Sequence, residues 1–199
     1  MILKYLTKIE VGKDEAFSLG LSDSYSWHQI LWKAFPGHHG EKRFFLFRVD
    51  EKETFFLLYL LSQFEVSLLD WGAFQTKKIG DEFLTHSHYR FQLKANPTKR
   101  LARGNGKGKR VGIYKEEDLK QWFLRKAEQS GFYSDDFVAS QPISDYFNKK
   151  GRRNKLNRVD FQGVLEVTDN EMFKTTFNTG IGSAKSLGYG MIVLQPIIV

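Results

Sequence analysis

The chain has 199 residues and a mass of 23.2 kDa, and it contains no cysteine, which excludes disulfide bonds and thiolate metal sites. It has no apolar run of about 18 residues and no signal-peptide pattern, so we expect a cytoplasmic protein without a membrane-spanning helix. The hydrophobic content of 41%, with 18 Phe, is sufficient for packed cores in one large domain or two small ones.

The net charge of +7 is distributed unevenly along the chain. Residues 1–88 contain 10 Lys/Arg and 12 Asp/Glu, whereas residues 89–199 contain 20 and 11. Two stretches have no acid: Lys94–Arg110 with seven basic residues and Lys149–Arg158 with six. Such clustering is typical of proteins that bind polyanions, because each neutralised phosphate releases counterions. Two solvated loops would have the same composition, so charge alone leaves both interpretations open.

The first half of the chain predicts a strand, a helix and a hairpin. The helix extends over Ser22–Pro36, with Ser22, Asp23 and Ser24 as capping residues and Pro36 as its stop. Its buried stripe consists of Trp27, Ile30, Leu31 and Ala34, and Gln29, Trp32 and Lys33 are expected on the remaining surface. The strands are expected at Met1–Glu10, Lys42–Val49 and Thr54–Leu61, the last two joined by a turn at Asp50–Glu53. We do not assign elements within Ser67–Gly80.

The second half repeats this order with an insertion. Asn96-Pro97 ends its first strand, and a Gly-rich basic loop follows. Further strands are expected at His88–Ala95, Val159–Val167 and Gly188–Pro196. Phe132–Phe147 predicts a hairpin or paired strands around Gln141-Pro142. Helices are expected at Lys115–Ser130, ended by Gly131, and at Asn170–Asn178. Two β-α-β-β-α-β units predict an α+β protein with tandem ferredoxin-like domains, residues 1–87 and 88–199.

The glycine-rich segment Thr179–Gly190 does not match the two best-known phosphate-binding motifs. A Walker A loop needs Gly where Ala184 stands, and a dinucleotide fingerprint beginning at Gly180 needs Gly where Lys185 stands. The loop has two remaining interpretations. Its backbone N–H groups cradle phosphates with Lys185 supplying charge, or it is a tight connection between a helix and a strand.

Other catalytic chemistries find little support in the residue pattern. The pairs His38-His39 and His86/His88 have no carboxylate partner at a recognisable spacing, and Asp50, Asp70 and Asp81 form no paired-carboxylate pattern. No G-x-S-x-G nucleophile elbow occurs. We therefore predict a reaction without a metal or another cofactor.

Tyr25, His28 and Lys33 of the first helix suit metal-free RNA cleavage. Attack by the substrate's own 2′-hydroxyl needs a general base, a general acid and positive charge for the phosphorane. His28 can take either proton role, Tyr25 can donate or exchange a proton, and Lys33 can offset developing charge. Taken alone, Tyr25 and His28 are more often packing residues, so the helix by itself leaves both interpretations open.

Four motifs across the chain resemble the CRISPR-associated endoribonucleases of the CasE type, in the repeat-associated (RAMP) superfamily. They are Y-x-x-H-Q-x-L-W at Tyr25–Trp32, R-F-Q-L-K-A-N-P-T-K-R at Arg90–Arg100, F-x-G-x-L-x-V at Phe161–Val167, and G-I-G-S-A-K-S-L-G-Y-G-M at Gly180–Met191. Each motif alone is modestly specific. Their order and spacing together are highly specific.

The resemblance implies tandem ferredoxin-like domains and metal-independent cleavage of precursor CRISPR RNA at the 3′ base of each repeat hairpin. It implies a cyclic phosphate and a 5′-hydroxyl as products, retention of the hairpin, and assembly with other subunits of a Cascade-type complex. The family's catalytic His and Tyr match His28 and Tyr25, and Lys33 matches a Lys that only some members have. In relatives a basic hairpin meets the RNA stem, and Asn148–Lys155 matches it in position and charge.

From these motifs and the charge clusters we predict an RNA-binding surface that involves sixteen residues. They are Lys94, Lys99, Arg100, Arg103, Lys107, Lys109, Arg110, Lys149, Lys150, Arg152, Arg153, Lys155, Arg158, Gly180, Gly182 and Lys185. Two rival functions remain: a hairpin-binding subunit that has lost catalysis, and a metal-dependent DNA nuclease, which the missing carboxylate cluster disfavours.

Overall fold

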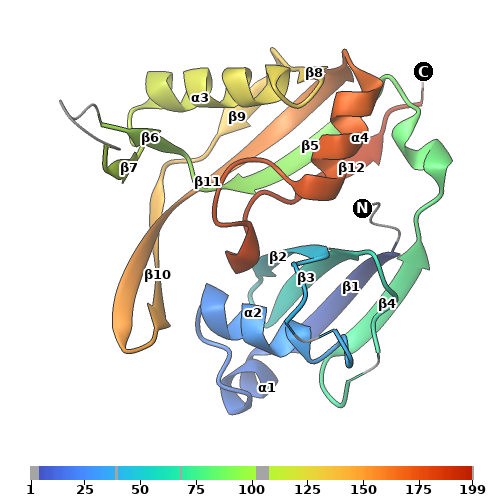
Figure 1. Ribbon diagram of the computed structural model, residues 1–199, viewed down its shortest axis with the longest axis vertical. Coiled ribbons are helices and arrows are strands. Elements are labelled where there is room, and N and C mark those ends of the chain that lie inside the picture. Colours follow the sequence, from blue (N-terminus) through green and yellow to red (C-terminus); the bar gives the residue numbers. More distant parts are fainter. Residues whose placement is uncertain (1–4, 39, 68, 102–107, 199) are drawn as a thin grey trace.

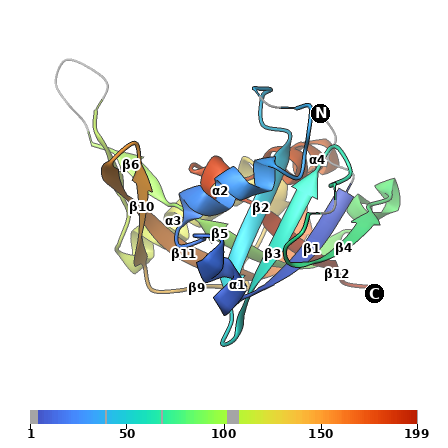
Figure 2. The ribbon, with the colours of Figure 1, turned by 90° about the horizontal axis from the view of Figure 1, so that it is seen from below.

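The protein was described with a computed structural model that covers residues 5–38, 40–67, 69–101 and 108–198. The first half forms a four-stranded antiparallel sheet in the order β2-β3-β1-β4 (Figure 1). Its strands are β1 (Tyr5–Gly12), β2 (Phe45–Glu51), β3 (Phe55–Ser62) and β4 (Ala73–Lys78). Helices α1 (Lys13–Ser18) and α2 (Ser24–Trp32) cover the face of this sheet that is turned away from the second sheet (Figures 1 and 2). A short 3-10 helix, η1 (Asp81–Leu84), leads to the second half.

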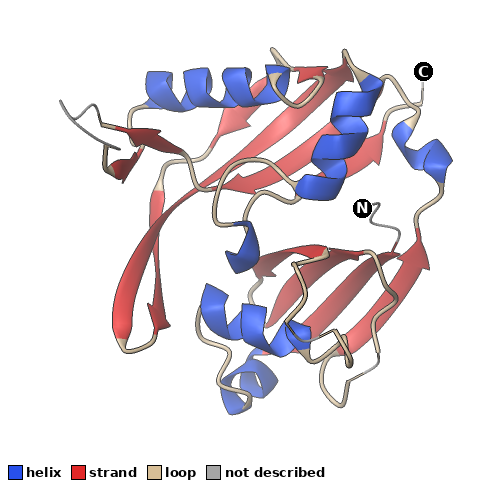
Figure 3. Ribbon diagram, viewed as in Figure 1, coloured by secondary structure: helices blue, strands red, loops and turns tan. Residues whose placement is uncertain are grey.

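The second half forms another antiparallel sheet, in the order β10-β11-β5-β12, with β8 and β9 also paired to β11. Its strands are β5 (His88–Ala95), β8 (Phe132–Tyr133), β9 (Phe137–Ala139), β10 (Ile143–Lys149), β11 (Arg152–Val167) and β12 (Ile192–Pro196). Helices α3 (Glu116–Glu128) and α4 (Asn170–Thr179) pack on one face (Figure 3). The insertion forms a small hairpin of β6 (Thr98–Arg100) and β7 (Arg110–Gly112), and the 3-10 helix η2 (Lys185–Leu187) precedes β12.

The predicted tandem ferredoxin-like architecture is confirmed, with two corrections. In the first unit, the described residues between β3 and β4 contain no helix, although β4 takes its expected place beside β1. In the second unit, Phe132–Phe147 does contain paired strands, but the hairpin alternative is wrong, because β8, β9 and β10 each pair with β11 and not with one another. The reason is that β11 has 16 residues and begins at Arg152, seven positions before the predicted start at Val159. The longer strand offers pairing positions to all three strands.

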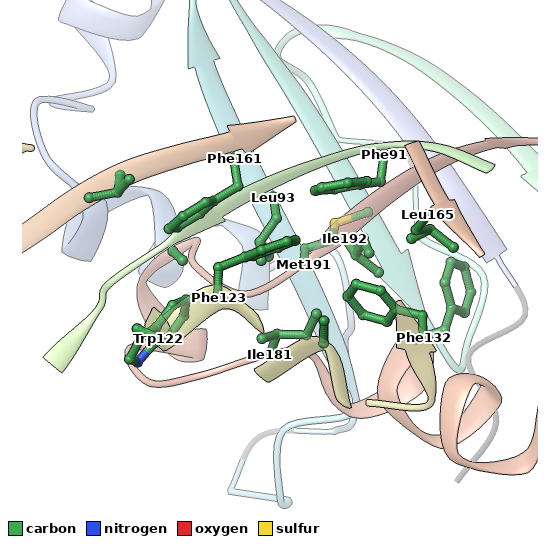
Figure 4. Close-up of a cluster of buried hydrophobic side chains, with 14 of the residues drawn as sticks. Phe91, Leu93, Trp122, Phe123, Phe132, Phe161, Leu165, Ile181, Met191 and Ile192 are labelled. Carbon is green, nitrogen blue, oxygen red and sulfur yellow. The ribbon is translucent and has the colours of Figure 1, made fainter. Parts of the chain in front are cut away.

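The second core lies between the sheet and its helices, and it is largely aromatic. Phe123 of α3 lies parallel to Phe91 of β5 and Phe161 of β11, with ring centroids 5.4 Å and 5.0 Å away (Figure 4). Leu46 and Leu61 of the first sheet belong to the same cluster, so the two halves share buried apolar surface. This shared core fixes where α2 lies relative to the second half. None of the helices in the described ranges is long and apolar enough to cross a membrane.

Candidate nucleic-acid interface and reaction centre

Helix α2 begins where the sequence predicts, because its first turn is capped twice. The carboxylate of Asp23 accepts hydrogen bonds from the backbone N–H groups of Tyr25 and Ser26, both at 2.9 Å. The Ser26 hydroxyl in turn accepts the N–H of Asp23 at 3.1 Å, which completes a capping box. The predicted stripe of Trp27, Ile30, Leu31 and Ala34 is buried, as expected. The helix ends at Trp32, earlier than the predicted stop at Pro36.

His28 lies half-buried on α2 and is held by an aromatic neighbour. The indole N–H of Trp32 donates to Nε2 of His28 at 3.3 Å. Because an indole nitrogen can only donate, Nε2 is the unprotonated nitrogen and Nδ1 carries the proton. Within the described ranges, the buried Nδ1 has no hydrogen-bond partner. The prediction of Trp32 as a surface residue is wrong, because its ring packs edge-on against Phe45 of β2 at 5.1 Å.

The electrostatic environment keeps His28 neutral. Burial lowers the pKa of His28 below its usual value, and the positive charges of Arg43 and Lys149 lower it further. The neutral form therefore dominates at neutral pH. Arg43 is absent from our predicted site because it directly precedes the apolar run of β2 and looks like an ordinary flanking charge. Only the fold brings it close to His28.

The structure brings Tyr25 and His28 together and adds Lys149 to them. The ring centroids of Tyr25 and His28 are 6.3 Å apart, and the Lys149 ammonium lies 5.5 Å from the Tyr25 ring centroid. Lys33 follows the last residue of α2, and its side chain is exposed. The cations that act on the pKa of His28 are Arg43 and Lys149. These two residues therefore supply the positive charge beside His28 that we expected from Lys33.

The basic segment Asn148–Lys155 forms the predicted hairpin between β10 and β11. Its two turn residues, Lys150 and Gly151, have φ angles of 51° and 71°, as a two-residue hairpin turn of type I′ requires. The basic side chains that it exposes are those of Lys149, Lys150, Arg152, Arg153 and Lys155. Two of them lie over exposed tyrosines: Arg153 over Tyr146 at 4.1 Å, and Lys155 over Tyr114 at 5.5 Å from the ring centroids.

The carboxylate of Asp23 connects helix α2 to this hairpin. The oxygen Oδ1 of Asp23 caps α2, and Oδ2 accepts the backbone N–H of Asn148 at 2.9 Å. Asn148 lies on the edge strand β10, opposite Arg153 of β11. At this position of an antiparallel pair the N–H of Asn148 points away from β11, so it is free to bind Asp23. Asp23 therefore fixes the distance between His28 and the basic hairpin.

The remaining predicted RNA-binding residues have different environments. Lys94 is buried, and its ammonium contacts Asp50 at 3.1 Å and the carbonyl of Val49, so it is a structural cation between the two sheets and not an RNA contact. Arg158 is half-buried beside Asp145 and Asp160, at 3.6 Å and 3.7 Å.

The insertion keeps most of its predicted cations at the surface. Lys99 is exposed and paired with Asp118 at 2.8 Å, whereas Arg100, Lys109 and Arg110 are exposed. Arg103 and Lys107 lie outside the described residues.

The glycine-rich loop is mainly a packing connection. The N–H of Gly180 donates to the carbonyl of Thr176 at 2.7 Å, and that of Gly190 donates to the backbone carbonyl of Lys94 at 2.7 Å. The prediction that Gly180 offers its N–H to a phosphate is therefore wrong. Gly180 has a φ of 76°, and a Cβ there would lie 2.9 Å from the carbonyl oxygen of Gly190 and 3.2 Å from Leu46 of the first sheet, so the loop needs glycine where the two halves meet. Gly180, Gly182 and the half-buried Lys185 line a basic cavity.

Within the described ranges, no group of three or more His, Asp or Glu side chains is arranged to hold a metal ion.

Comparison with known proteins relates this arrangement to a family. A family model described as CRISPR associated protein matches residues 4–196. The Cascade subunit CasE of Escherichia coli is 31% identical, over 97% of this chain and 100% of the relative. The CRISPR-associated endoribonuclease Cse3 of Thermus thermophilus is 28% identical, over 96% and 100%. A structure of Thermus thermophilus Cse3 bound to an RNA that represents a pre-cleavage complex superposes with a TM-score of 0.82, at 27% identity, over 98% of this chain and 100% of that chain. The chain therefore belongs to the family of CRISPR-associated proteins and, within it, to the CasE type.

Proposed function

We propose that this protein is a metal-independent endoribonuclease that binds the stem-loop of a CRISPR repeat and cuts precursor CRISPR RNA at the 3′ base of the hairpin. The relatives support the reaction class, since one is named an endoribonuclease and its structure holds an RNA before cleavage. The CasE relative is a Cascade subunit, and we extend that role to this chain. The protein then keeps its product hairpin within a complex of that kind, in the cytoplasm, where the RNA is transcribed.

The observation that carries the proposal is a neutral, half-buried His28 among Tyr25, Arg43 and Lys149. In the free protein the lone pair of Nε2 of His28 accepts the indole N–H of Trp32. The substrate's 2′-hydroxyl takes the place of that N–H and gives its proton to Nε2. The 2′ oxygen then bonds to phosphorus while the bond from phosphorus to the 5′ oxygen breaks. The products are a 2′,3′-cyclic phosphate and a 5′-hydroxyl.

The neighbours of His28 supply the remaining requirements of this reaction. Tyr25 protonates the leaving 5′ oxygen, and the cations Arg43 and Lys149 offset the charge of the phosphorane. Lys33, exposed just beyond the end of α2, contacts the RNA backbone beside the cut.

We further assign these tasks to two domains, residues 1–87 with the reaction centre and residues 88–199 with the RNA-binding hairpin. All strands of the first sheet precede that boundary, and all strands of the second sheet follow it. The exposed cations of the β10–β11 hairpin suit the stem, because proteins recognise an A-form helix mainly through its phosphates and its shape. Asp23 holds the two parts in register.

The decisive test is cleavage of a labelled repeat hairpin in the presence of EDTA. Wild-type protein should cut it and leave a cyclic phosphate, and a 2′-deoxy nucleotide at the cut should abolish the reaction. His28→Ala should bind the hairpin without cutting it. His88→Ala, which removes an imidazole at the start of β5, is the matched control and should cut normally. Full activity of His28→Ala would sink the assignment.

The alternative, a hairpin-binding subunit without catalysis, predicts a different result in the same assay. Wild-type protein would then bind the hairpin and leave it intact, with or without a divalent metal. Cleavage only when a metal is added would instead favour a metal-dependent nuclease.

A further inference from the structure

A cavity of about 570 Å³ lies in the second half of the chain, apart from His28. It is lined by residues of α3, the C-terminal part of α4, the β6–β7 hairpin and the glycine-rich loop. Six cations line it: Lys99, Arg100, Arg110, Arg125, Lys126 and Lys185. Among the residues that the structure describes, neither an aspartate nor a glutamate lines the cavity.

The positive charge of this cavity is largely uncompensated. Lys99 is paired with Asp118, but the other five cations have no ion-pair partner within the described ranges. Lys126 donates a hydrogen bond to the neutral side chain of Gln129 at 2.8 Å. Burial lowers the pKa of Lys185, and repulsion from Arg43 and Lys126 lowers it further. Like charges held together around a concave surface concentrate positive potential and attract a polyanion.

The polar groups between the cations suit a sugar–phosphate backbone. The hydroxyl of Ser183 is held in place, because it accepts the side-chain amide of Asn96 at 3.2 Å and donates to the Asn96 carbonyl at 3.2 Å. Thr179 at the end of α4 also lines the cavity, and its hydroxyl donates to the carbonyl of Thr175 at 2.9 Å. The hydroxyl hydrogens of Ser183 and Thr179 are taken by backbone carbonyls, so their oxygens are left to accept the ribose 2′-hydroxyl, and the cations bind the phosphate oxygens.

The size of the cavity favours a single strand over a duplex. Its volume is in the range of pockets that enclose a small ligand, so it holds roughly one or two nucleotides. An A-form duplex presents its phosphates on a convex surface and suits an exposed hairpin better. Single-stranded RNA is typically bound in positively charged grooves that follow its backbone.

One cation, Arg43, affects both the cavity and the surroundings of His28. Arg43 acts on the pKa of both His28 and Lys185, so positive potential extends from His28 through Arg43 to the cavity. Resting on the proposed function, we propose that this cavity binds the phosphate backbone of single-stranded RNA that flanks the repeat stem. The β10–β11 hairpin and the cavity then hold two different parts of one substrate.

The test compares three uncleavable RNA probes, each with a 2′-deoxy nucleotide at the cut. One is the bare repeat hairpin, the second carries single-stranded extensions of about eight nucleotides, and the third carries a base-paired extension of similar length. Wild-type protein should bind the single-stranded extension probe more tightly than the bare hairpin. The double variant Arg125→Gln/Lys126→Gln should bind both probes with the affinity that wild-type protein shows for the bare hairpin.

The salt dependence gives the expected size of the effect. Each lost phosphate contact on a single strand lowers the slope of log affinity against log salt by about 0.7, so the double variant should lose about 1.4 on that probe. Lys115→Gln/Lys120→Gln is the matched control, because it removes two charges beside the start and in the first half of α3, outside the cavity lining. It should behave as wild type on every probe.

Two results would overturn the cavity proposal. One is an equal loss of affinity by Arg125→Gln/Lys126→Gln on the base-paired and single-stranded extensions, which would place duplex RNA in the cavity. The other is a wild-type protein that gains nothing from the single-stranded extension. Binding of the bare hairpin reports on the proposed function alone, so a failure of that function is seen separately. Thermal unfolding of both double variants checks that they fold.

Discussion

Replacing Asp23 separates the capping of α2 from its connection to the basic hairpin. Asp23→Ser keeps a good N-cap residue but removes the oxygen that accepts the Asn148 N–H at 2.9 Å. Asp23→Ala removes both interactions. The cap is worth about 1 kcal/mol, and we assign about 1 kcal/mol to the hydrogen bond from the exposed Asn148. For a chain of this size, each kcal/mol shifts Tm by roughly 2–4 °C, so we expect a decrease of roughly 4–8 °C for Ala and half of that for Ser.

The effect on catalysis should exceed the effect on stability. If α2 is no longer tied to the hairpin, His28 is displaced from the cut while the hairpin still binds RNA. Because small displacements of a reacting group cost much of the rate, the single-turnover cleavage rate of Asp23→Ser should decrease by about tenfold or more. Its affinity for the repeat hairpin should change less than its rate. The assay therefore measures the rate at saturating protein and the affinity separately.

Asp169→Ser is the matched control for this experiment. Asp169 caps α4 through a hydrogen bond from the Met172 N–H at 2.9 Å, so the variant changes the same residue type at the same helix position. Its cleavage rate should equal that of wild type. Equal rate losses in Asp169→Ser and Asp23→Ser would show a general stability effect. A wild-type rate in Asp23→Ser would refute the positioning role of the bridge.

Four further predictions concern the hairpin, the pH dependence of wild type and of Lys149→Gln, and the glycine-rich loop. Replacing Arg152 and Arg153 by Gln should reduce the salt dependence of hairpin binding by roughly one unit of slope per lost phosphate contact, and an unchanged slope would show that they do not touch the RNA. If His28 is the general base, the cleavage rate should rise with pH through a pKa below the usual histidine value and then level off, whereas a decrease above that pKa would make it the acid. Lys149→Gln removes a charge that lowers this pKa, so its acidic limb should move to higher pH, which rate measurements at saturating protein would detect. Gly190→Ala places a Cβ 2.3 Å from a backbone carbonyl oxygen at a φ of 81°, so it should destabilise the fold by more than about 1 kcal/mol in a denaturant titration, and wild-type stability would contradict this geometry.

The sequence determined the parts of this protein that depend on neighbouring residues. Alternating apolar residues identified most strands, and capping residues such as Asp23 located the start of α2. The family resemblance located the basic hairpin, because Asn148–Lys155 matches that of relatives in position and charge. Tyr25 and His28 were found together because three residues of helix place them on one flank, a distance that local geometry fixes.

Tertiary structure decided the features that depend on residues distant in sequence. Asp23 and Asn148 are 125 positions apart, and no local pattern indicates that one accepts a hydrogen bond from the other. Arg43 and Lys94 look alike in sequence as cations near apolar strands. Folding leaves Arg43 near His28 and buries Lys94 against Asp50 between the two sheets. Burial and charge pairing arise only when separate elements pack, so they determined which of the predicted cations remain available to RNA.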